Sequence, residues 1–210
     1  MAAKRIDPSV RYAEDYLPDT APAETARRAS ADLKLAPVSR ATGRTLTVLA
    51  RLAQARTVVE IGTGTGVSGL ALFAGMPDDG VLTTIDIEAQ HQMAAREAFR
   101  AAGIPHQRYR LISGEAMSVL PKLASGAYDL ALIDADFLEY PEYFEEALRL
   151  VRPGGLVVIN HALLAGKVAN AENFDDDTMI VRDTLEAARA MADLTVALIP
   201  VGDGLLLAVR

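Results

Sequence analysis

The sequence of 210 residues contains no cysteine, few aromatic residues and no long hydrophobic run. The lack of cysteine excludes disulfide bonds, thiolate catalysis and cysteine-based zinc sites. No apolar run approaches the roughly 18 residues that a membrane-spanning helix requires. The segment Met1–Val10 also lacks the apolar core of a signal peptide. These absences favour a cytoplasmic protein.

Positive charge is scarce as well. The chain has 21 lysine and arginine residues against 28 aspartate and glutamate residues, and its net charge is −7. Nucleic acids and anionic membranes are bound by basic surfaces, so this acidic balance argues against both as partners. Hydrophobic residues make up 50% of the chain, which is enough for a sizeable core. The length suits one domain.

The chain alternates between predicted strands and helices after an N-terminal part of different character. Residues 1–22 contain three prolines and are expected to be irregular, and helices are expected at 23–35 and 39–54. Beyond them, helices are expected at 67–75, 88–102, 115–124, 141–151 and 177–191. Strands are expected at 57–61, 81–86, 109–112, 128–134, 156–160, 194–199 and 204–209.

This order predicts an α/β fold of the Rossmann-like type. Strands that alternate with helices form parallel units with right-handed crossovers. The last two strands are too close in sequence for a helical crossover, so they should form an antiparallel hairpin. We therefore expect a three-layer sandwich with a mostly parallel seven-stranded sheet. Residues 1–35 should be a helical segment that caps the site, and residues 36–210 should be the ligand-binding domain.

A glycine-rich loop follows the strand at 57–61. Gly62, Gly64 and Gly66 allow a tight turn and the close approach of a ligand to the N-terminus of the next helix. Asp86 ends the next strand, where its carboxylate can bind the ribose of an adenosine. Residues 64–69 also fit the G-x-G-x-x-G pattern of dinucleotide enzymes, so loop and aspartate together suit NAD as well as S-adenosylmethionine (SAM).

Three features favour SAM over NAD. Glu60 precedes the loop, where a carboxylate suits an ammonium and a sulfonium and repels a pyrophosphate. The C-terminal hairpin departs from the all-parallel sheet that is typical of dinucleotide folds. The fourth predicted strand ends in the acidic segment Asp134-Ala135-Asp136.

These residues resemble a known family. The run Val58-Val59-Glu60-Ile61-Gly62-Thr63-Gly64-Thr65-Gly66-Val67-Ser68 is similar to motif I of the class I O-methyltransferases related to catechol and caffeoyl-CoA O-methyltransferases. Leu82–Glu88 resembles the second strand of that family, and Tyr128–Asp136 resembles the fourth. Arg152-Pro153-Gly154-Gly155 fits the segment before its fifth strand. The resemblance extends from about residue 35 to the C-terminus.

The resemblance implies a SAM site with a role for each matching residue. The residues implied to hold the methionine part of SAM are Val38, Glu60, Gly62, Thr63, Gly64 and Ser68. Asp86 would bind the ribose and Ile87 would pack on the adenine, which Glu115 and Ala116 would bracket. Asp134 and Asp136 would face the reaction centre.

The expected acceptor side departs from the family pattern. Related enzymes bind a divalent cation through two aspartates and an asparagine, with a lysine nearby. Here Asp134 keeps the first position, Asn160 and His161 occupy the next two, and Phe137 replaces the lysine. Two hypotheses stay open. Asp134, Asn160 and His161 could bind a metal, although a histidine ligand favours a softer ion than magnesium. Alternatively, His161 could act as the general base beside Asp134.

The acceptor pocket is expected to contain Phe137, Leu138, Tyr140 and the loop at 162–166, with Tyr12 and Tyr16 as a cover. The other histidines, His91 and His106, are expected to be solvated. The function predicted is an O-methyltransferase that acts on a small hydroxylated molecule, with aromatic acceptors included, and forms a homodimer. The alternatives are an NAD(P)-dependent oxidoreductase and a non-catalytic SAM-binding protein.

Overall fold

The computed structural model describes residues 7–210, and the first six residues of the predicted N-terminal segment lie outside it. The helices are α1 (Pro8–Asp15), α2 (Ala21–Asp32), α3 (Arg40–Leu52), α4 (Val67–Gly75), α5 (Ala89–Ala101), α6 (Ala116–Val119), α7 (Tyr140–Leu150) and α8 (Asp176–Ala190). The strands are β1 (Thr57–Ile61), β2 (Val81–Asp86), β3 (Tyr109–Ser113), β4 (Tyr128–Ile133), β5 (Val151–Ile159), β6 (Thr195–Ile199) and β7 (Leu205–Val209).

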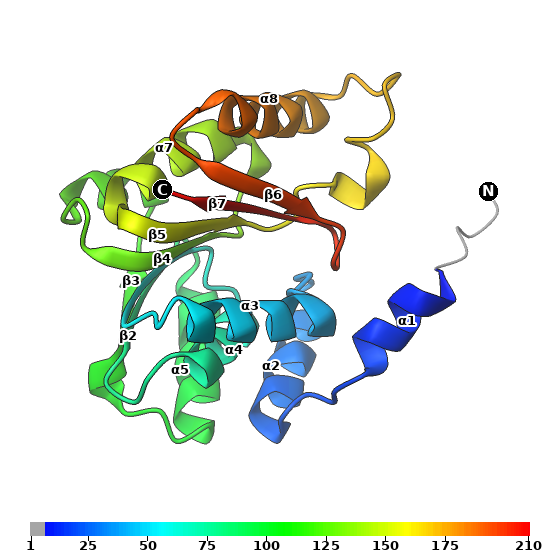
Figure 1. Cartoon of the computed structure of the whole chain (residues 1–210). Helices are drawn as coiled ribbons and strands as arrows, with labels where there is room; N and C mark the ends of the chain where they lie inside the picture. Colours follow the sequence, from blue (N-terminus) through cyan, green and yellow to red (C-terminus); the bar gives the residue numbers. More distant parts are fainter. Residues whose placement is uncertain (1–6) are drawn as a thin grey trace.

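The seven strands form one sheet in the order β3-β2-β1-β4-β5-β7-β6. Strands β1 to β5 pair in parallel, whereas β7 is antiparallel to both β5 and β6. Helices α7 and α8 cover one face of the sheet, and α3, α4 and α5 cover the other (Figure 1). The predicted three-layer sandwich and its C-terminal hairpin are therefore confirmed.

Two hydrophobic cores fill the space between the layers. Successive side chains of a strand point to opposite faces, so Val58 joins the core beneath α3, α4 and α5, while Val59 joins the core beneath α7 and α8. The other strands of the sheet alternate in the same way. Burial on both faces explains why the central strands consist mainly of apolar residues.

The N-terminal part differs from the expectation of an irregular segment, because Pro8–Asp15 is a helix. Asp7 caps it by accepting a hydrogen bond from the Ser9 amide at 2.7 Å. A proline in the first turn favours a helix start, so Pro8 begins this helix instead of preventing it. In Figure 1, α1 lies at the side of the domain, and none of its residues is buried.

Several other elements have limits different from those predicted, and strand β5 and helix α6 differ most. Strand β5 begins at Val151, ahead of Pro153-Gly154-Gly155, because a bulge opposite Tyr128 and Leu130 absorbs these residues into the sheet. The helix expected at 115–124 is only Ala116–Val119, followed by a 3-10 turn at Leu120–Lys122. Pro121 lacks the amide hydrogen that a longer helix would need.

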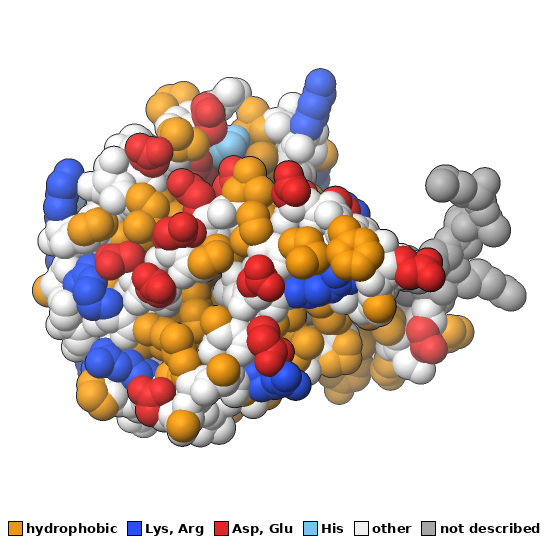
Figure 2. Space-filling model, turned by 90° about the horizontal axis from the view of Figure 1, so that it is seen from above, with side chains coloured by type: hydrophobic (Ala, Val, Ile, Leu, Met, Phe, Trp, Pro, Cys, Tyr) orange, Lys and Arg blue, Asp and Glu red, His pale blue; other side chains and the backbone are white. Residues whose placement is uncertain are grey.

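Acidic and hydrophobic side chains are spread over the face of the molecule drawn in Figure 2. This distribution agrees with the net charge of −7. Within residues 7–210, no helix is long and apolar enough to cross a membrane.

Helices α3 and α4 cross closely at Gly75, where an added Cβ atom would lie 2.1 Å from the Thr47 carbonyl oxygen. We predict that Gly75→Ala lowers the free energy of unfolding by about 1–3 kcal/mol, as overpacking does. Gly43→Ala is the matched control in the same helix pair, since its Cβ would meet Ala71 at an ordinary 3.6 Å. That variant should be neutral or more stable by up to about 1 kcal/mol. Urea denaturation of both variants tests the packing, and equal effects would contradict it.

Candidate functional site

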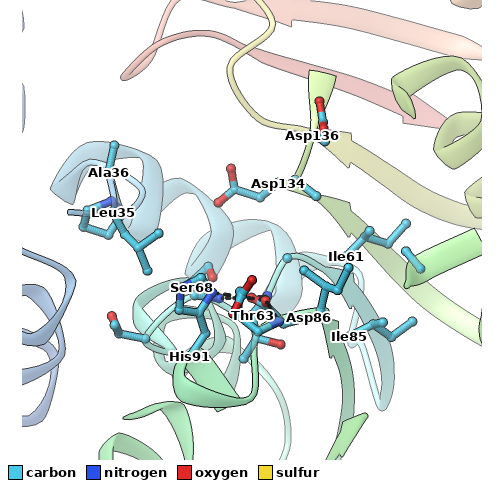
Figure 3. A pocket seen from close by; sticks show the side chains of 18 of the residues that line it. Leu35, Ala36, Ile61, Thr63, Ser68, Ile85, Asp86, His91, Asp134 and Asp136 are labelled. Atoms are coloured by element: carbon cyan, nitrogen blue, oxygen red, sulfur yellow. Dashed lines mark hydrogen bonds and ion pairs between the residues drawn. The ribbon is translucent and has the colours of Figure 1, made fainter. Parts of the chain in front are cut away.

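A cavity of about 550 Å³ opens at the carboxyl ends of the central strands. It lies where the strand order reverses between β1 and β4, which is the usual ligand position in an open α/β sheet. Its walls come from the loops after β1, β2, β3 and β4, from His161 after β5, and from residues 35–38 before α3. Figure 3 shows part of this lining around the open space, with Asp134 above it and Asp86 below.

The glycine loop after β1 forms the floor of this cavity. Gly62, Gly64 and Gly66 have φ angles of +93°, +49° and +85°. A Cβ atom on Gly62 would lie 2.0 Å from the carbonyl oxygen of Asp134, so only glycine fits there. Gly66 is the left-handed N-cap residue of α4. The predicted glycine turn thus brings the ends of β1 and β4 together and aims the N-terminus of α4 at the cavity.

Asp86 organises the glycine loop through its side chain. Its Oδ2 atom accepts hydrogen bonds from the amides of Thr63 at 3.1 Å and Gly64 at 2.9 Å. Its Oδ1 atom accepts one from the Glu88 amide at 2.9 Å and lies 3.1 Å from His91 Nδ1. The Asp86 carboxylate therefore fixes the conformation of the glycine loop, in addition to its predicted role in binding the ribose.

The expectation that His91 is solvated was wrong. Its side chain is only 18% exposed, contacts Asp86 and lines the cavity. His91 lies in the first turn of α5, and this turn places its side chain next to Asp86 at the end of β2. The expectation for His106 was correct, because this residue is exposed.

Glu60 lies behind the loop and is completely buried. Its Oε2 atom accepts a hydrogen bond from the Thr84 hydroxyl at 2.6 Å, whereas Oε1 has no partner within residues 7–210. Burial raises the pKa of this carboxyl to about 8, against the opposing effect of the nearby hydroxyl groups of Ser68 and Thr84. Ser68 lines the cavity, whereas Glu60 lies behind its lining residues. A carboxyl group with a free buried oxygen is a suitable partner for a cationic ligand.

The remaining predicted cofactor residues lie along the cavity at different depths. Val38 is buried, and so is Ala116, the first residue of α6. Ile87 lies at the rim of the cavity and is 68% exposed. Glu115 and Asp136 also line the cavity and are exposed. In Figure 3 the carboxylate of Asp134 points into the open space, whereas that of Asp136 points away from the glycine loop.

Asp134 and His161 meet at the opposite wall from Asp86. The distance from His161 Nε2 to Asp134 Oδ1 is 3.6 Å, and the Asn160 amide nitrogen donates to the same oxygen at 2.9 Å. Burial raises the pKa of Asp134, although His161 and Asn160 oppose the shift. The other ring nitrogen of His161 lies 2.9 Å from Asp203 Oδ2. Sequence reasoning missed Asp203, which lies between β6 and β7.

The donor set at this wall does not fit a divalent cation. Asp134 is the only carboxylate among the three predicted ligands, and Asn160 turns its amide nitrogen toward it as a donor. The ring of Phe137, at the position of the family lysine, packs against His161 with centroids 5.8 Å apart. Within residues 7–210, no group of three histidine, aspartate or glutamate residues could hold a metal ion. The metal-ligand hypothesis therefore lacks support from the donor chemistry.

The predicted acceptor pocket needs correction at several positions, because of its expected residues Phe137 lines the cavity, whereas Leu138, Tyr140 and the loop at 162–166 do not. Tyr140 is fully buried and donates its hydroxyl to the Asn160 carbonyl at 3.0 Å, so it belongs to the core. Tyr143, nearly one turn further along α7, lines the cavity together with Phe137 and Glu139. Tyr12 and Tyr16 are 70% and 67% exposed on α1. The helical spacing could have indicated that Tyr140 and Tyr143 share one side of α7, but not which of them reaches the cavity.

The chain matches known O-methyltransferases over nearly its whole length. The family model described as O-methyltransferase matches residues 12–210. A protein of Mycobacterium sp. (strain JLS) that is named as an O-methyltransferase is 47% identical over 209 residues, which cover 98% of this chain and 94% of the relative.

Two solved structures share the fold and were determined with a ligand. The O-methyltransferase TomG from Streptomyces achromogenes, involved in tomaymycin synthesis and solved in complex with SAM, is 31% identical with a TM-score of 0.85, and the match covers 95% of this chain and 94% of TomG. The O-methyltransferase from Bacillus cereus in complex with S-adenosylhomocysteine (SAH) is 27% identical with a TM-score of 0.86, and the match covers 96% of each chain. With its sequence motifs, sheet order and near full-length matches in agreement, the chain belongs to the O-methyltransferase family.

Proposed function

We propose that this O-methyltransferase uses SAM as methyl donor and transfers the methyl group to a hydroxyl of a small acceptor, with aromatic acceptors included. The observation that carries the proposal is the cavity between the glycine loop and the wall of Asp134 and His161. Relatives with the same fold bind SAM or SAH. The family match supports this function over an NAD(P)-dependent oxidoreductase and over a non-catalytic binding protein.

The residues of the floor and walls suit SAM along its length. The loop amides at Gly62, Thr63 and Gly64 would surround its methionine part together with Val38 and Ser68. Glu60, with its free Oε1, would compensate the positive charge. Asp86 would accept from the ribose, while Ile87, Glu115 and Ala116 would enclose the adenine. Asp134 and Asp136 would lie toward the acceptor.

We assign the base to His161 and a supporting role to Asp134. Bound SAM supplies an electrophilic methyl group, so that the acceptor oxygen forms a new C–O bond as the C–S bond breaks and its electron pair stays on sulfur. His161 Nε2 faces the cavity wall beside Asp134 and would take the hydroxyl proton. The nearby carboxylate of Asp134 would stabilise the imidazolium that forms. Apolar contacts from Phe137 and Tyr143 would hold the acceptor and exclude water.

The N-terminal residues 1–35 are proposed to cap this site. Support comes from Ser30 and Leu35, which line the cavity, and from Glu14 on α1. The Glu14 carboxylate accepts from the Ser39 hydroxyl at 2.7 Å and from the Ala41 amide at 2.9 Å, which anchors α1 to the N-terminus of α3.

We further propose that exposed apolar residues of α1 contribute to a homodimer, and that the enzyme works in the cytoplasm on a small molecule.

SAM binding should release a proton at neutral pH. Glu60 has a pKa of about 8 in the free protein, so its carboxyl is mostly protonated at pH 7. A cationic ligand favours the ionised form and lowers that pKa, so SAM affinity should rise with pH until about 8 and then level off. Isothermal titration calorimetry in two buffers with different ionisation enthalpies measures the released proton. Glu60→Gln should abolish the release, whereas exposed Glu97→Gln should keep it. Equal proton release in wild type and Glu60→Gln would contradict the pairing.

His161→Ala should reduce kcat by about 10²–10⁴ because the acceptor loses its general base. The exposed residue His106 supplies the control variant His106→Ala, which should keep the wild-type rate. The assay is transfer of a radiolabelled methyl group from SAM to a panel of catechols and other small phenols.

Treatment with EDTA should leave the rate unchanged, since the donor set does not fit a divalent cation. Activity that EDTA abolishes and magnesium restores would overturn the metal-free mechanism.

A further inference from the structure

The loop after β5 has an unusual backbone conformation. His161, Leu164 and Ala165 have φ angles of +54°, +44° and +51°, in the left-handed region that disfavours residues with a side chain. Such residues are strained and persist only where the surrounding structure over-determines their conformation. The loop must therefore be held in place by contacts from elsewhere in the fold.

Those contacts come from the turn between β6 and β7. The Ala162 amide donates to the Gly204 carbonyl at 3.1 Å, and the Leu163 amide donates to the Asp203 carbonyl at 2.9 Å. The Asp203 side chain adds two more contacts, because Oδ1 accepts from the Ala165 amide and Oδ2 lies 2.9 Å from His161 Nδ1. A single aspartate thus bridges both ends of the strained segment.

The orientation of His161 follows from this bridge. With Nδ1 against the Asp203 carboxylate, the ring turns Nε2 toward Asp134 at 3.6 Å. Phe137 packs edge-on against the imidazole, with an interplanar angle of 77°. A carboxylate can only accept, so Nδ1 must carry a hydrogen, and a neutral ring then keeps its lone pair on Nε2.

We propose that Asp203 is a positioning residue for methyl transfer, which holds His161 so that Nε2 keeps its lone pair and stays beside Asp134 at the wall of the cavity. This inference rests on the proposed role of His161 as base. Asp203 is 42 residues from His161 in sequence and touches neither SAM nor acceptor in this scheme. Its effect on the reaction passes through the imidazole alone.

Asp203→Asn separates this role from simple support of the loop. An asparagine keeps Oδ1 to accept from the Ala165 amide, but its amide nitrogen replaces Oδ2 and cannot accept from Nδ1. His161 would then favour the tautomer with hydrogen on Nε2 and would lose the basic lone pair. The equivalent exchange in a serine-protease triad keeps the geometry and lowers kcat by about 10⁴.

The experiment compares wild type, Asp203→Asn, Asp203→Ala and Asp193→Asn. Asp193 is an exposed aspartate just before β6 and serves as the control. We expect Asp203→Asn to lower kcat by at least about 100-fold, with KM for SAM and the melting temperature close to wild type. Asp203→Ala should also lower the melting temperature, because the bond to Ala165 is lost. Asp193→Asn should match wild type in every respect.

Proton NMR of the SAH-bound enzyme gives a readout that does not depend on turnover. A hydrogen-bonded Nδ1–H of His161 should give a downfield resonance in wild type that is missing in both His161→Ala and Asp203→Asn. Wild-type kcat in Asp203→Asn, or a downfield signal that survives in it, would overturn the proposal. If the signal behaves as expected while His161→Ala keeps full activity, the base assignment fails and the Asp203 contact stands without a catalytic role.

Discussion

The site depends on the close approach of the Gly62 backbone to the backbone of Asp134. The Asp134 amide donates to the Ile61 carbonyl at 2.8 Å, and the space beside Gly62 is too small for any Cβ atom. This contact joins the end of β1 to the end of β4, where the strand order reverses. The floor proposed to hold the cofactor and the wall proposed to face the acceptor therefore meet at one fixed point.

Three carboxyl groups surround this point, and each is held differently. Glu60 is completely buried, with one oxygen bonded to Thr84 and the other free. Asp86 is fixed by backbone amides of the glycine loop. Asp134 is held by Asn160 and faces His161. Because burial disfavours a charged carboxylate, Glu60 and Asp134 gain most from a positively charged neighbour.

The wall of Asp134, Asn160 and His161 differs in chemistry from the cation site that the family resemblance implies at these positions. Asn160 donates toward Asp134 instead of offering its oxygen, and Phe137 packs against His161 where the family has a lysine. These contacts are the basis for the proposal that His161 acts as the base. In this arrangement, the turn between β6 and β7 becomes part of the site through Asp203.

The amino-acid sequence alone determined the order of strands and helices, the closing hairpin and the glycine loop. These features follow from local patterns, namely apolar runs, turn residues and glycines. Glycine is needed where the backbone adopts a conformation that other residues disfavour. The pattern also placed Asp86 and Asp134 correctly at strand ends, because parallel strands end at one edge of the sheet. Pro8 was misread because a proline can begin a helix as well as end one.

Only the tertiary structure decided which side chains meet. Asp203 reaches His161 across 42 residues, and the turn of α5 brings His91 back to Asp86. Tyr143 reaches the cavity while Tyr140 stays in the core. These contacts depend on how the hairpin docks against the loop after β5 and how α7 rotates on the sheet. No spacing along the chain encodes such distances, since they result from packing between elements that are remote in sequence.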